Sequence, residues 1–442
     1  MLLLVLLVLS VMLGAYLRFG AVAGTMVIKP YRADASEYYR TAYNLRQFGV
    51  YSQQIKLVDG QEQPPAPDAI RPPGYPLFLA LFVDRPPDAK VFSDVEVVQA
   101  FLSVITLVLV GILMFRIATP WVACATLLFT AISPHIVNVS VFMVSETLFM
   151  LLLMAFFMAL VAVVRNPTRF LPWLFGAGLL LGMATLTRPI LELFPLVLAG
   201  LLFMSYPRRE ALKGSAALVL GFILVLTPWT VRNYISTGRS GDSSIMLSTL
   251  SGGMYPDFEY EHDPASRGEP YRFDPRTAEI NSSLGSVVKE IAHHFEEHPA
   301  EELKWYLVGK PLMLWSWDMF AGGNDTFIYP VVRSPYYSSP VYVVTHILMY
   351  NLHWPLVALA ALGCLFVWLP ALHRHLEPGP LLLARSCGLL LLYNTAILMV
   401  MAPYVRYSIP FLPLEYGMAA LAVYLLVVEA RRMAAERRTA AP

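Results

Sequence analysis

The chain has 442 residues, of which 57% are hydrophobic and only 14% are charged. Ordinary soluble proteins carry about a quarter charged residues, and the mean hydropathy here is +0.57. A water-soluble fold could not bury that much apolar surface, so the composition predicts an all-α polytopic membrane protein and excludes disorder, collagen-like repeats and coiled coils. The net charge of +1 gives no indication of a nucleic-acid partner.

Ten apolar runs are about long enough to cross a bilayer, which takes roughly 20 helical residues. In chain order they cover residues 2–23, 95–118, 121–140, 144–164, 170–186, 191–206, 211–229, 341–369, 381–402 and 408–429. The first run could instead be a signal peptide, because Ala21-Val22-Ala23 resembles a small-residue cleavage site. That run lacks a basic start and is long for a signal peptide, so a retained span is favoured.

Basic residues set the predicted orientation of these spans, because short cytoplasmic loops are rich in Lys and Arg. The basic residues that ten spans place on one side, together with both termini, include Arg116, Arg165, Arg209, Arg374 and Arg431. That side is predicted to be the cytoplasm. The chain is therefore predicted to be a multi-pass protein of the cell inner (plasma) membrane.

Two long hydrophilic loops then face the extracytoplasmic side of a single transmembrane domain, residues 1–442. The first loop covers about residues 29–96 and should carry juxtamembrane helices, and the second covers about residues 231–340. Two such loops suggest chemistry at the outer membrane surface. No internal repeat is evident in the sequence, which weighs against many secondary transporters because these are built from repeated halves.

A helix is predicted early in the first loop, where apolar residues recur at helical spacing and Gly49 suits the C-terminal cap. Two interpretations of Asp34 at its start stay open. Asp34 could cap the helix, with Glu37 completing an acidic variant of the capping box, or it could act chemically. Further on, Arg71 precedes two prolines that fix an extended entry, so its side chain is expected just outside the membrane.

Five more ionisable residues lie within or beside spans, where such residues are rare and usually functional. Each alone could be an interfacial side chain, and Arg188 could simply pair with Glu192. All five map to the outer edge that also carries Asp34 and Arg71, and this convergence favours a functional site. The five residues are Glu146, Arg188, Glu192, Arg232 and Arg406.

Taken together, these motifs resemble the GT-C superfamily of integral-membrane glycosyltransferases, and most closely the protein mannosyltransferase and aminoarabinose transferase families (glycosyltransferase family 39-like). The first acidic motif departs from that of relatives, because Asp34 is followed by Ala35 where relatives often have Asp-Glu. Some relatives also have more spans and a separate outer domain. The matching pieces, in family order, are the acidic helix at Asp34, Arg71-Pro-Pro-Gly-Tyr-Pro, Ser145-Glu-Thr-Leu-Phe, Leu186-Thr-Arg-Pro, Pro228-Trp-Thr-Val-Arg-Asn-Tyr and Arg406-Tyr-Ser-Ile-Pro-Phe-Leu-Pro.

The resemblance implies a GT-C fold with about ten transmembrane helices and two long extracytoplasmic loops. It also implies an inverting glycosyltransferase of the EC 2.4 class that moves a sugar from a polyprenyl-phosphate donor to an acceptor hydroxyl on a lipid, glycan or protein. Its partners would be polyprenyl phosphate and membrane lipids, with no cofactor apart from the lipid-linked donor.

The same resemblance makes residues 29–96 the loop that carries the catalytic residues and residues 231–340 the loop that recognises the acceptor or donor. With the chemistry of the reaction, it also assigns roles to individual residues. Asp34 is the expected base, with Glu146 as the second acidic residue. The donor phosphate is expected to meet Arg71, Arg232 and Arg406, because arginine matches phosphate bidentately. Possible substrate contacts are Glu37, Tyr38, Arg188 and Tyr337, and further candidates in or after the second loop are Tyr329, Tyr336 and His346.

Two other function classes stay open at this point. A lipid-linked sugar flippase or secondary transporter would need polar residues along a path through the membrane, and a non-catalytic scaffold would not need Asp34 and Arg71. No metal is predicted, because the polar clusters at residues 257–263 and 293–298 lack the spacing of zinc or calcium sites.

Overall fold

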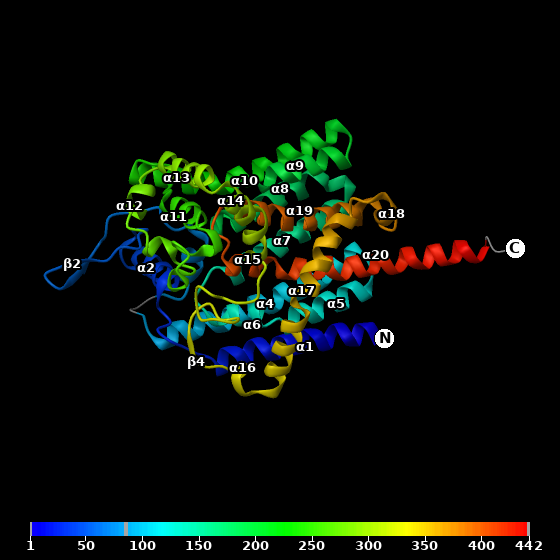
Figure 1. Cartoon of the computed structure of the whole chain (residues 1–442), viewed down its shortest axis with the longest axis horizontal. Helices are drawn as coiled ribbons and strands as arrows, with labels where there is room; N and C mark the ends of the chain where they lie inside the picture. The colour runs from blue at the N-terminus through cyan, green and yellow to red at the C-terminus, as the bar shows by residue number, and fades with distance from the viewer. Residues whose placement is uncertain (1, 84–86, 440–442) are drawn as a thin grey trace.

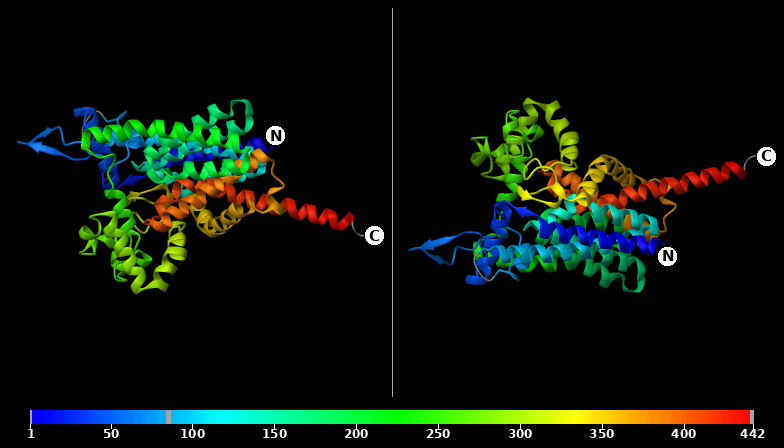
Figure 2. Two further views of the ribbon diagram at one scale, coloured as in Figure 1. Left: turned by 90° about the horizontal axis from the view of Figure 1, so that it is seen from above. Right: turned by 90° about the horizontal axis from the view of Figure 1, so that it is seen from below.

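The structure is a computed structural model that describes residues 2–83 and 87–439. Long helices lie side by side and run along the long axis of the molecule (Figure 1). The two large loops gather at one end, and both ends of the described chain lie toward the other (Figures 1 and 2). Residues 84–86 of the first loop lie outside the described residues.

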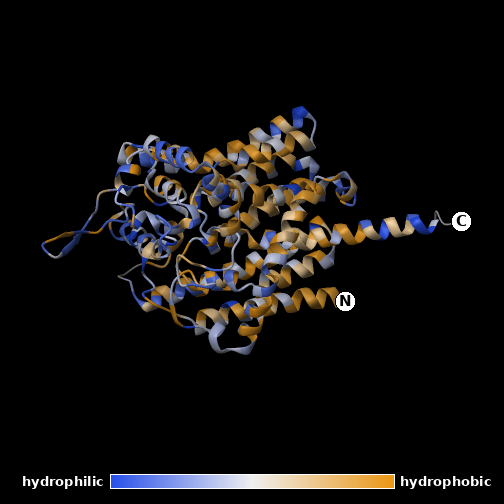
Figure 3. Cartoon of the chain, viewed as in Figure 1, coloured by the Kyte–Doolittle hydropathy of each residue, from blue (hydrophilic) through white to orange (hydrophobic). Residues whose placement is uncertain are grey.

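Eight helices in the described chain are long and apolar enough to cross a membrane, and they carry most of the orange, hydrophobic ribbon of Figure 3. They account for eight of the ten predicted runs. The eight helices are α1 (Leu2–Gly24), α4 (Ala89–Ile117), α7 (Glu146–Arg165), α8 (Phe170–Thr187), α10 (Arg208–Thr237), α17 (Pro340–Phe366), α19 (Pro378–Val400) and α20 (Leu412–Thr439).

The remaining two runs differ from a plain span. The third run forms α5 (Pro120–Ile132) and α6 (Pro134–Asn138), which are bent by 55° and count as a ninth span only if taken together. Pro134 explains the break, because proline cannot continue the hydrogen-bond ladder of a helix but suits a helix start. The sixth run forms the shorter α9 (Phe194–Ser205). The count of ten is thus eight clear spans, one broken span and one short helix.

Two loop boundaries differ from the sequence prediction. Helix α10 continues to Thr237 instead of ending near residue 230, so Arg232 lies inside the helix and the second loop begins later than residue 231. Hydropathy misses these turns because helix hydrogen bonds do not require apolar side chains. Helix α4 begins at Ala89, where the Asp88 carboxylate accepts a hydrogen bond from the Val91 amide, so the first loop ends earlier than residue 96.

The first loop contains α2 (Ala33–Phe48), the hairpin β2 (Lys56–Val58) and β3 (Gln61–Gln63), and the short α3 (Gly74–Leu79). The predicted helix and its glycine cap are confirmed, since Gly49 has a φ of 66° and its amide bonds to helix carbonyls. The capping interpretation of Asp34 is wrong, because Arg32 is the N-cap residue and no side chain caps this end. The Asp34 carboxylate is therefore available for other partners.

The second loop folds over the same end of the molecule and is tied to the first by a two-stranded sheet. Strand β1 (Met26–Val27) follows the first span and pairs antiparallel with β4 (Val331–Arg333). These strands and the β2–β3 hairpin are the departures from an all-α fold. The helices of the second loop are α11 (Ser244–Gly252), α12 (Thr277–Ile280), α13 (Leu284–Glu297), α14 (Pro299–Lys304), α15 (Lys310–Leu314) and α16 (Pro335–Ser338), and α18 (Pro370–His373) lies between α17 and α19.

Candidate active site

Six charged side chains meet at the loop end of the helices, and we call them the charge cluster. They come from α2, the segment before α3, the start of α7, the end of α8 and the turn before α20, which are far apart in the sequence. Three are carboxylates and three are guanidiniums, so the charge cluster is neutral when all six are ionised. Its members are Asp34, Glu37, Arg71, Glu146, Arg188 and Arg406.

Asp34 lies between two arginines. One carboxylate oxygen accepts from Arg71 Nη2 at 2.6 Å and the other from Arg406 Nη1 at 2.7 Å. Burial alone would raise the pKa of Asp34, but Arg406 and Arg71 hold the pKa of this carboxyl well below its ordinary value. The preceding residue, Ala33, has a φ of 44°, a left-handed conformation that is strained for alanine. This conformation sets the direction in which the first turn of α2 leaves the preceding segment.

Glu146 is the fully buried centre of the charge cluster. It opens helix α7, where the helix dipole favours a negative charge. Arg188 Nη1 donates to one of its oxygens at 2.8 Å. Arg406 makes a two-point contact through Nε and Nη2, with Nη2 at 3.2 Å from the second oxygen. Arg188 therefore pairs with Glu146, and the alternative pairing with Glu192 is wrong.

Arg71 is held in place from both its backbone and its side chain. Its carbonyl accepts from the Tyr51 hydroxyl at 2.8 Å. Its guanidinium lies over the Tyr38 ring, 5.2 Å from the centroid, and its Nε donates to Glu37 Oε2 at 2.6 Å. The nearby Gly74 approaches α8 so closely that a Cβ there would lie 2.9 Å from the Leu186 carbonyl oxygen. A bulkier residue would push Arg71 away from the end of α8.

Two of the predicted site residues lie apart from the charge cluster. Arg232 donates to backbone carbonyls, to Asp68 O at 2.6 Å and to Tyr51 O at 3.0 Å. Its guanidinium also lies over the Tyr51 and Trp229 rings. Tyr337 is 59% exposed and packs on Phe327. The structure thus brings together Asp34, Glu37, Tyr38, Arg71, Glu146, Arg188 and Arg406, and leaves Arg232 and Tyr337 outside.

Three further residues complete the site. Ser145 Oγ accepts from Arg188 at 3.2 Å, and the Tyr407 ring lies under the same guanidinium. Both residues stand inside recognised motifs, so motif membership was the signal that could have found them. Tyr329 of the second loop is 6% exposed, and its hydroxyl makes no well-formed hydrogen bond to any described residue. Burial raises the pKa of Tyr329, the charge of Arg406 lowers it, and the charges of Asp34 and Glu146 raise it further.

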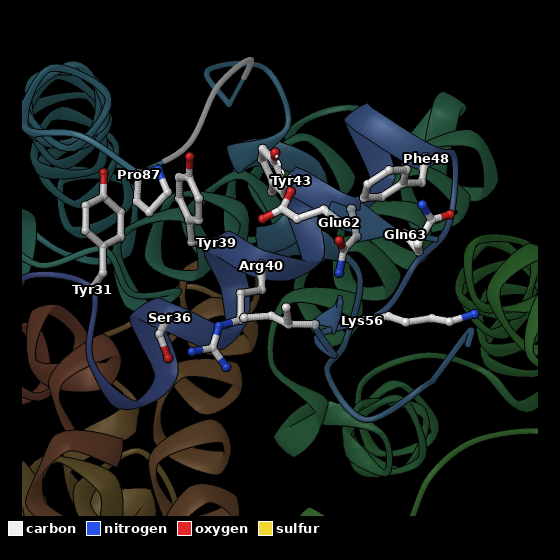
Figure 4. A pocket seen from close by; sticks show the side chains of 12 residues that line it. Tyr31, Ser36, Tyr39, Arg40, Tyr43, Phe48, Lys56, Glu62, Gln63 and Pro87 are labelled. Carbon is white, nitrogen blue, oxygen red and sulfur yellow. Dashed lines mark hydrogen bonds between the residues drawn. The ribbon is translucent and has the colours of Figure 1, made fainter. Parts of the chain in front are cut away.

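A groove of about 330 Å³ lies on the face of α2 that points away from the charge cluster. In Figure 4 the tyrosine rings stand along one side of it, while Arg40 and Lys56 extend along the other. The Tyr43 hydroxyl crosses to Glu62 at 2.9 Å and joins α2 to the β2–β3 hairpin. None of the predicted site residues lines this groove, so the groove and the charge cluster are separate places.

The carboxylates of Asp34 and Glu146 in the charge cluster are already hydrogen-bonded to arginines, so the cluster is not arranged to bind a cation. Both oxygens of Asp34 and both of Glu146 accept hydrogen bonds from guanidinium groups. Among residues 2–83 and 87–439, no group of three or more His, Cys, Asp or Glu side chains is arranged to hold a metal ion. A cation entering between the carboxylates would have to displace an arginine first.

Solved structures with a similar arrangement exist. The apo oligosaccharyltransferase of Archaeoglobus fulgidus aligns with 99% of this chain, at a TM-score of 0.52 and 11% identity. The same organism's AglB in complex with an inhibitory peptide and a dolichol-phosphate aligns with 100%, at 0.53 and 12%. The chain has the GT-C fold. The chain spans 52% of the length of those enzymes, and the fold that the sequence resemblance implied is confirmed.

Sequence comparison adds one family match. The family described as dolichyl-phosphate-mannose-protein mannosyltransferase matches residues 71–231 of the chain, which include Arg71, Glu146 and Arg188. ArnT from Cupriavidus metallidurans bound to undecaprenyl phosphate aligns with 96% of the chain and 77% of its own length, at a TM-score of 0.39 and 13% identity. No curated protein matches the sequence significantly.

Proposed function

We propose that the protein is an inverting glycosyltransferase that moves a sugar from a polyprenyl-phosphate donor to an acceptor hydroxyl on a lipid, glycan or protein. The observation that carries the proposal is the position of Asp34 between Arg71 and Arg406, at the loop end of a GT-C fold. A carboxylate and two guanidiniums are the groups that this reaction needs at one place. The names of the similar proteins support the donor class, since they mention dolichyl-phosphate-mannose and dolichol-phosphate.

In the proposed reaction Asp34 takes the proton of the acceptor hydroxyl. The acceptor oxygen forms a bond to the anomeric carbon on the face opposite the phosphate, which inverts that carbon. The bond between the anomeric carbon and the phosphate oxygen breaks, and its electron pair leaves with the polyprenyl phosphate. Negative charge grows on that phosphate, and preorganised arginines stabilise it.

The three arginines would divide this work unequally. Arg71 is the arginine on the first loop, and its carboxylate partners are partly exposed, at 28% for Asp34 and 34% for Glu37. Arg406 bridges Asp34 and the buried Glu146, which fixes the angle between the two carboxylates. Arg188 neutralises Glu146 from the other side. We assign phosphate binding first to Arg71, and positioning first to Arg188 and Arg406.

The proposal includes the side of the membrane. The loop end would face the extracytoplasmic side of the inner (plasma) membrane, with both termini in the cytoplasm. Reporter fusions after Arg209 and Arg432 should then report the cytoplasm, and fusions after Gln61 and Asp274 the outer side. A fusion after Gln61 that reports the cytoplasm would place Asp34 in the wrong compartment and contradict the proposal.

The activity is tested by comparing a strain that lacks the gene with strains carrying the parent, Asp34→Asn or Glu62→Gln. Mass spectrometry of envelope glycans, lipids and proteins should show a sugar that the parent restores and Asp34→Asn does not. Glu62→Gln is the matched control, because Glu62 is a carboxylate of the same loop that bonds only Tyr43 among the described residues. Normal glycosylation with Asp34→Asn would reject Asp34 as the base, and lipid-linked sugar that crosses the membrane without transfer would favour a flippase.

A further inference from the structure

The neutral charge cluster constrains how an anionic donor can bind. A polyprenyl-phosphate sugar carries one negative charge on its phosphodiester, whereas the three carboxylates already occupy the three guanidiniums. Hydrogen bonds between ionised partners are the strong ones. Each guanidinium keeps N–H groups that can reach a phosphate, but its charge is already balanced by a carboxylate. The phosphate therefore competes with the carboxylates for the arginines, and an arginine that turns from its carboxylate toward the phosphate relieves that competition.

The burial of each carboxylate shows which arginine can leave its partner at the lowest cost in free energy. Arg406 holds Glu146 at two points, and Glu146 is fully buried, so leaving it unpaired would place an uncompensated charge in the protein interior. Arg188 serves the same buried carboxylate. The carboxylates that bind Arg71 are partly exposed, so water can solvate the one it leaves. Arg71 is the arginine that can be redirected.

Glu37 decides how far Arg71 can move. It accepts from Arg71 Nε at 2.6 Å and also lies 2.5 Å from Nη2, whereas Asp34 is reached by Nη2 alone. The guanidinium could turn while Nε keeps its hydrogen bond to Glu37, and this turn would move Nη2 from Asp34 to a phosphate. Glu37 would hold the Arg71 side chain in the site throughout. The Tyr38 ring, 5.2 Å below the guanidinium, supports its plane through that rotation.

We propose that Arg71 exchanges Asp34 for the donor phosphate and that Glu37 is the positioning residue that tethers Arg71 during the exchange. This inference rests on the proposed function, because it assumes a polyprenyl-phosphate donor. Before the donor binds, Asp34 is held by two guanidiniums and is a weak base. Once Arg71 has turned to the phosphate, Asp34 keeps only Arg406 and accepts a proton more readily. The base is thus strengthened only when the donor is in place.

The exchange makes an unusual prediction for binding, because the carboxylates compete with the phosphate for Arg71. Removing either competitor should tighten the complex with polyprenyl phosphate, by about fivefold for a partly exposed ion pair. The experiment measures the affinity of undecaprenyl phosphate for the purified full chain in nanodiscs, for the parent, Glu37→Gln and Asp34→Asn. Glu62→Gln removes an equal charge from the same loop without touching Arg71 and should bind as the parent does.

Tighter binding separates this proposal from a structural role, because a variant that merely loosens the site binds more weakly. Thermal melting of each variant is recorded in parallel, and the isosteric Asp34→Asn serves as the second variant if Glu37→Gln melts early. If the parent binds undecaprenyl phosphate and neither variant binds it more tightly, the exchange is wrong while the proposed function stands. If the parent does not bind the lipid phosphate at all, the donor class of the proposed function fails and the exchange fails with it.

Discussion

Two arginines at the loop end, Arg71 and Arg232, occupy similar surroundings and contact different partners. Each guanidinium lies about 5 Å from a tyrosine ring, Tyr38 for Arg71 and Tyr51 for Arg232. Arg71 donates to two carboxylates, whereas Arg232 donates to the backbone carbonyls of Asp68 and Tyr51. The sequence assigned phosphate binding to both.

The difference shows what an arginine's partner says about its task. A carboxylate can be replaced by another anion, so Arg71 can change partners when a phosphate arrives. A backbone carbonyl that loses its donor in a partly buried place stays unsatisfied, so Arg232 is better suited to holding the first loop against α10. We call the charge cluster the Arg71 region, and we call Arg232 with its partners Asp68, Tyr51 and Trp229 the Arg232 region. Substitutions in the two regions can then be compared.

The largest effect is expected from Glu146→Gln, which removes the carboxylate at the centre of the Arg71 region. Arg188 would lose its carboxylate partner and Arg406 would keep only Asp34, and breaking a buried ion pair in this way typically costs about 3–5 kcal/mol. We expect a lower melting temperature in detergent and loss of transfer. Tyr51→Phe keeps the ring that Arg232 contacts and removes only the hydroxyl that donates to the Arg71 and Pro72 carbonyls, so it should cost about 1 kcal/mol. Equal losses in the two variants would contradict the comparison.

The next effect is that of Arg71→Ala, tested against Arg232→Ala. Losing one donor from a preorganised anion site costs about a hundredfold in rate. Arg71→Ala should lose transfer to that extent and should also weaken binding of undecaprenyl phosphate. Arg232→Ala should keep an affinity close to that of the parent. The measurement is lipid-phosphate affinity in nanodiscs, and a greater loss of affinity in Arg232→Ala would return phosphate binding to that residue.

The sequence predicted the fold and most of the charge cluster, because long apolar runs and short motifs are local signals. It could not predict the partners of the arginines. The Arg188–Glu146 pair joins two different helices, and hydropathy ended the seventh span before Arg232. Tyr329 was a candidate from sequence, but its burial beside the charge cluster was not predictable, because the nearby β4 pairs with β1, some 300 residues earlier in the chain, and such a contact leaves no local pattern. Contacts set by packing between distant segments therefore needed the structure.

A smaller effect is expected in the Arg232 region itself. Arg232→Ala takes the guanidinium from the Asp68 carbonyl and leaves the Tyr51 carbonyl with only the Asp68 amide as donor, at a cost of about 1–3 kcal/mol. Arg232→Lys keeps the charge but cannot span both carbonyls, so it should recover only part of that loss. The measurement is the melting temperature, together with protease cutting of the first loop. An unchanged melting temperature and cutting pattern in Arg232→Ala would show that these bonds do not anchor the loop.

The smallest expected effect is a shift in pH dependence that only the Arg71 region should cause. The pKa of Asp34 is held below its ordinary value by Arg406 and Arg71, against the effect of burial, whereas the Arg232 guanidinium bonds to the carbonyls of Asp68 and Tyr51. Transfer needs the ionised carboxylate, so kcat/KM, which reports the free enzyme, should fall only when the pH drops below the ordinary range of an aspartate. Arg71→Ala removes one of the two cations, so the pKa of Asp34 rises and the acid limb of kcat/KM moves to higher pH.

Arg232→Ala is the control and should leave that acid limb where the parent has it. Each variant is returned to neutral pH after the acid measurement to exclude denaturation, and a limb that moves in Arg232→Ala but not in Arg71→Ala would reverse the roles assigned to the two arginines.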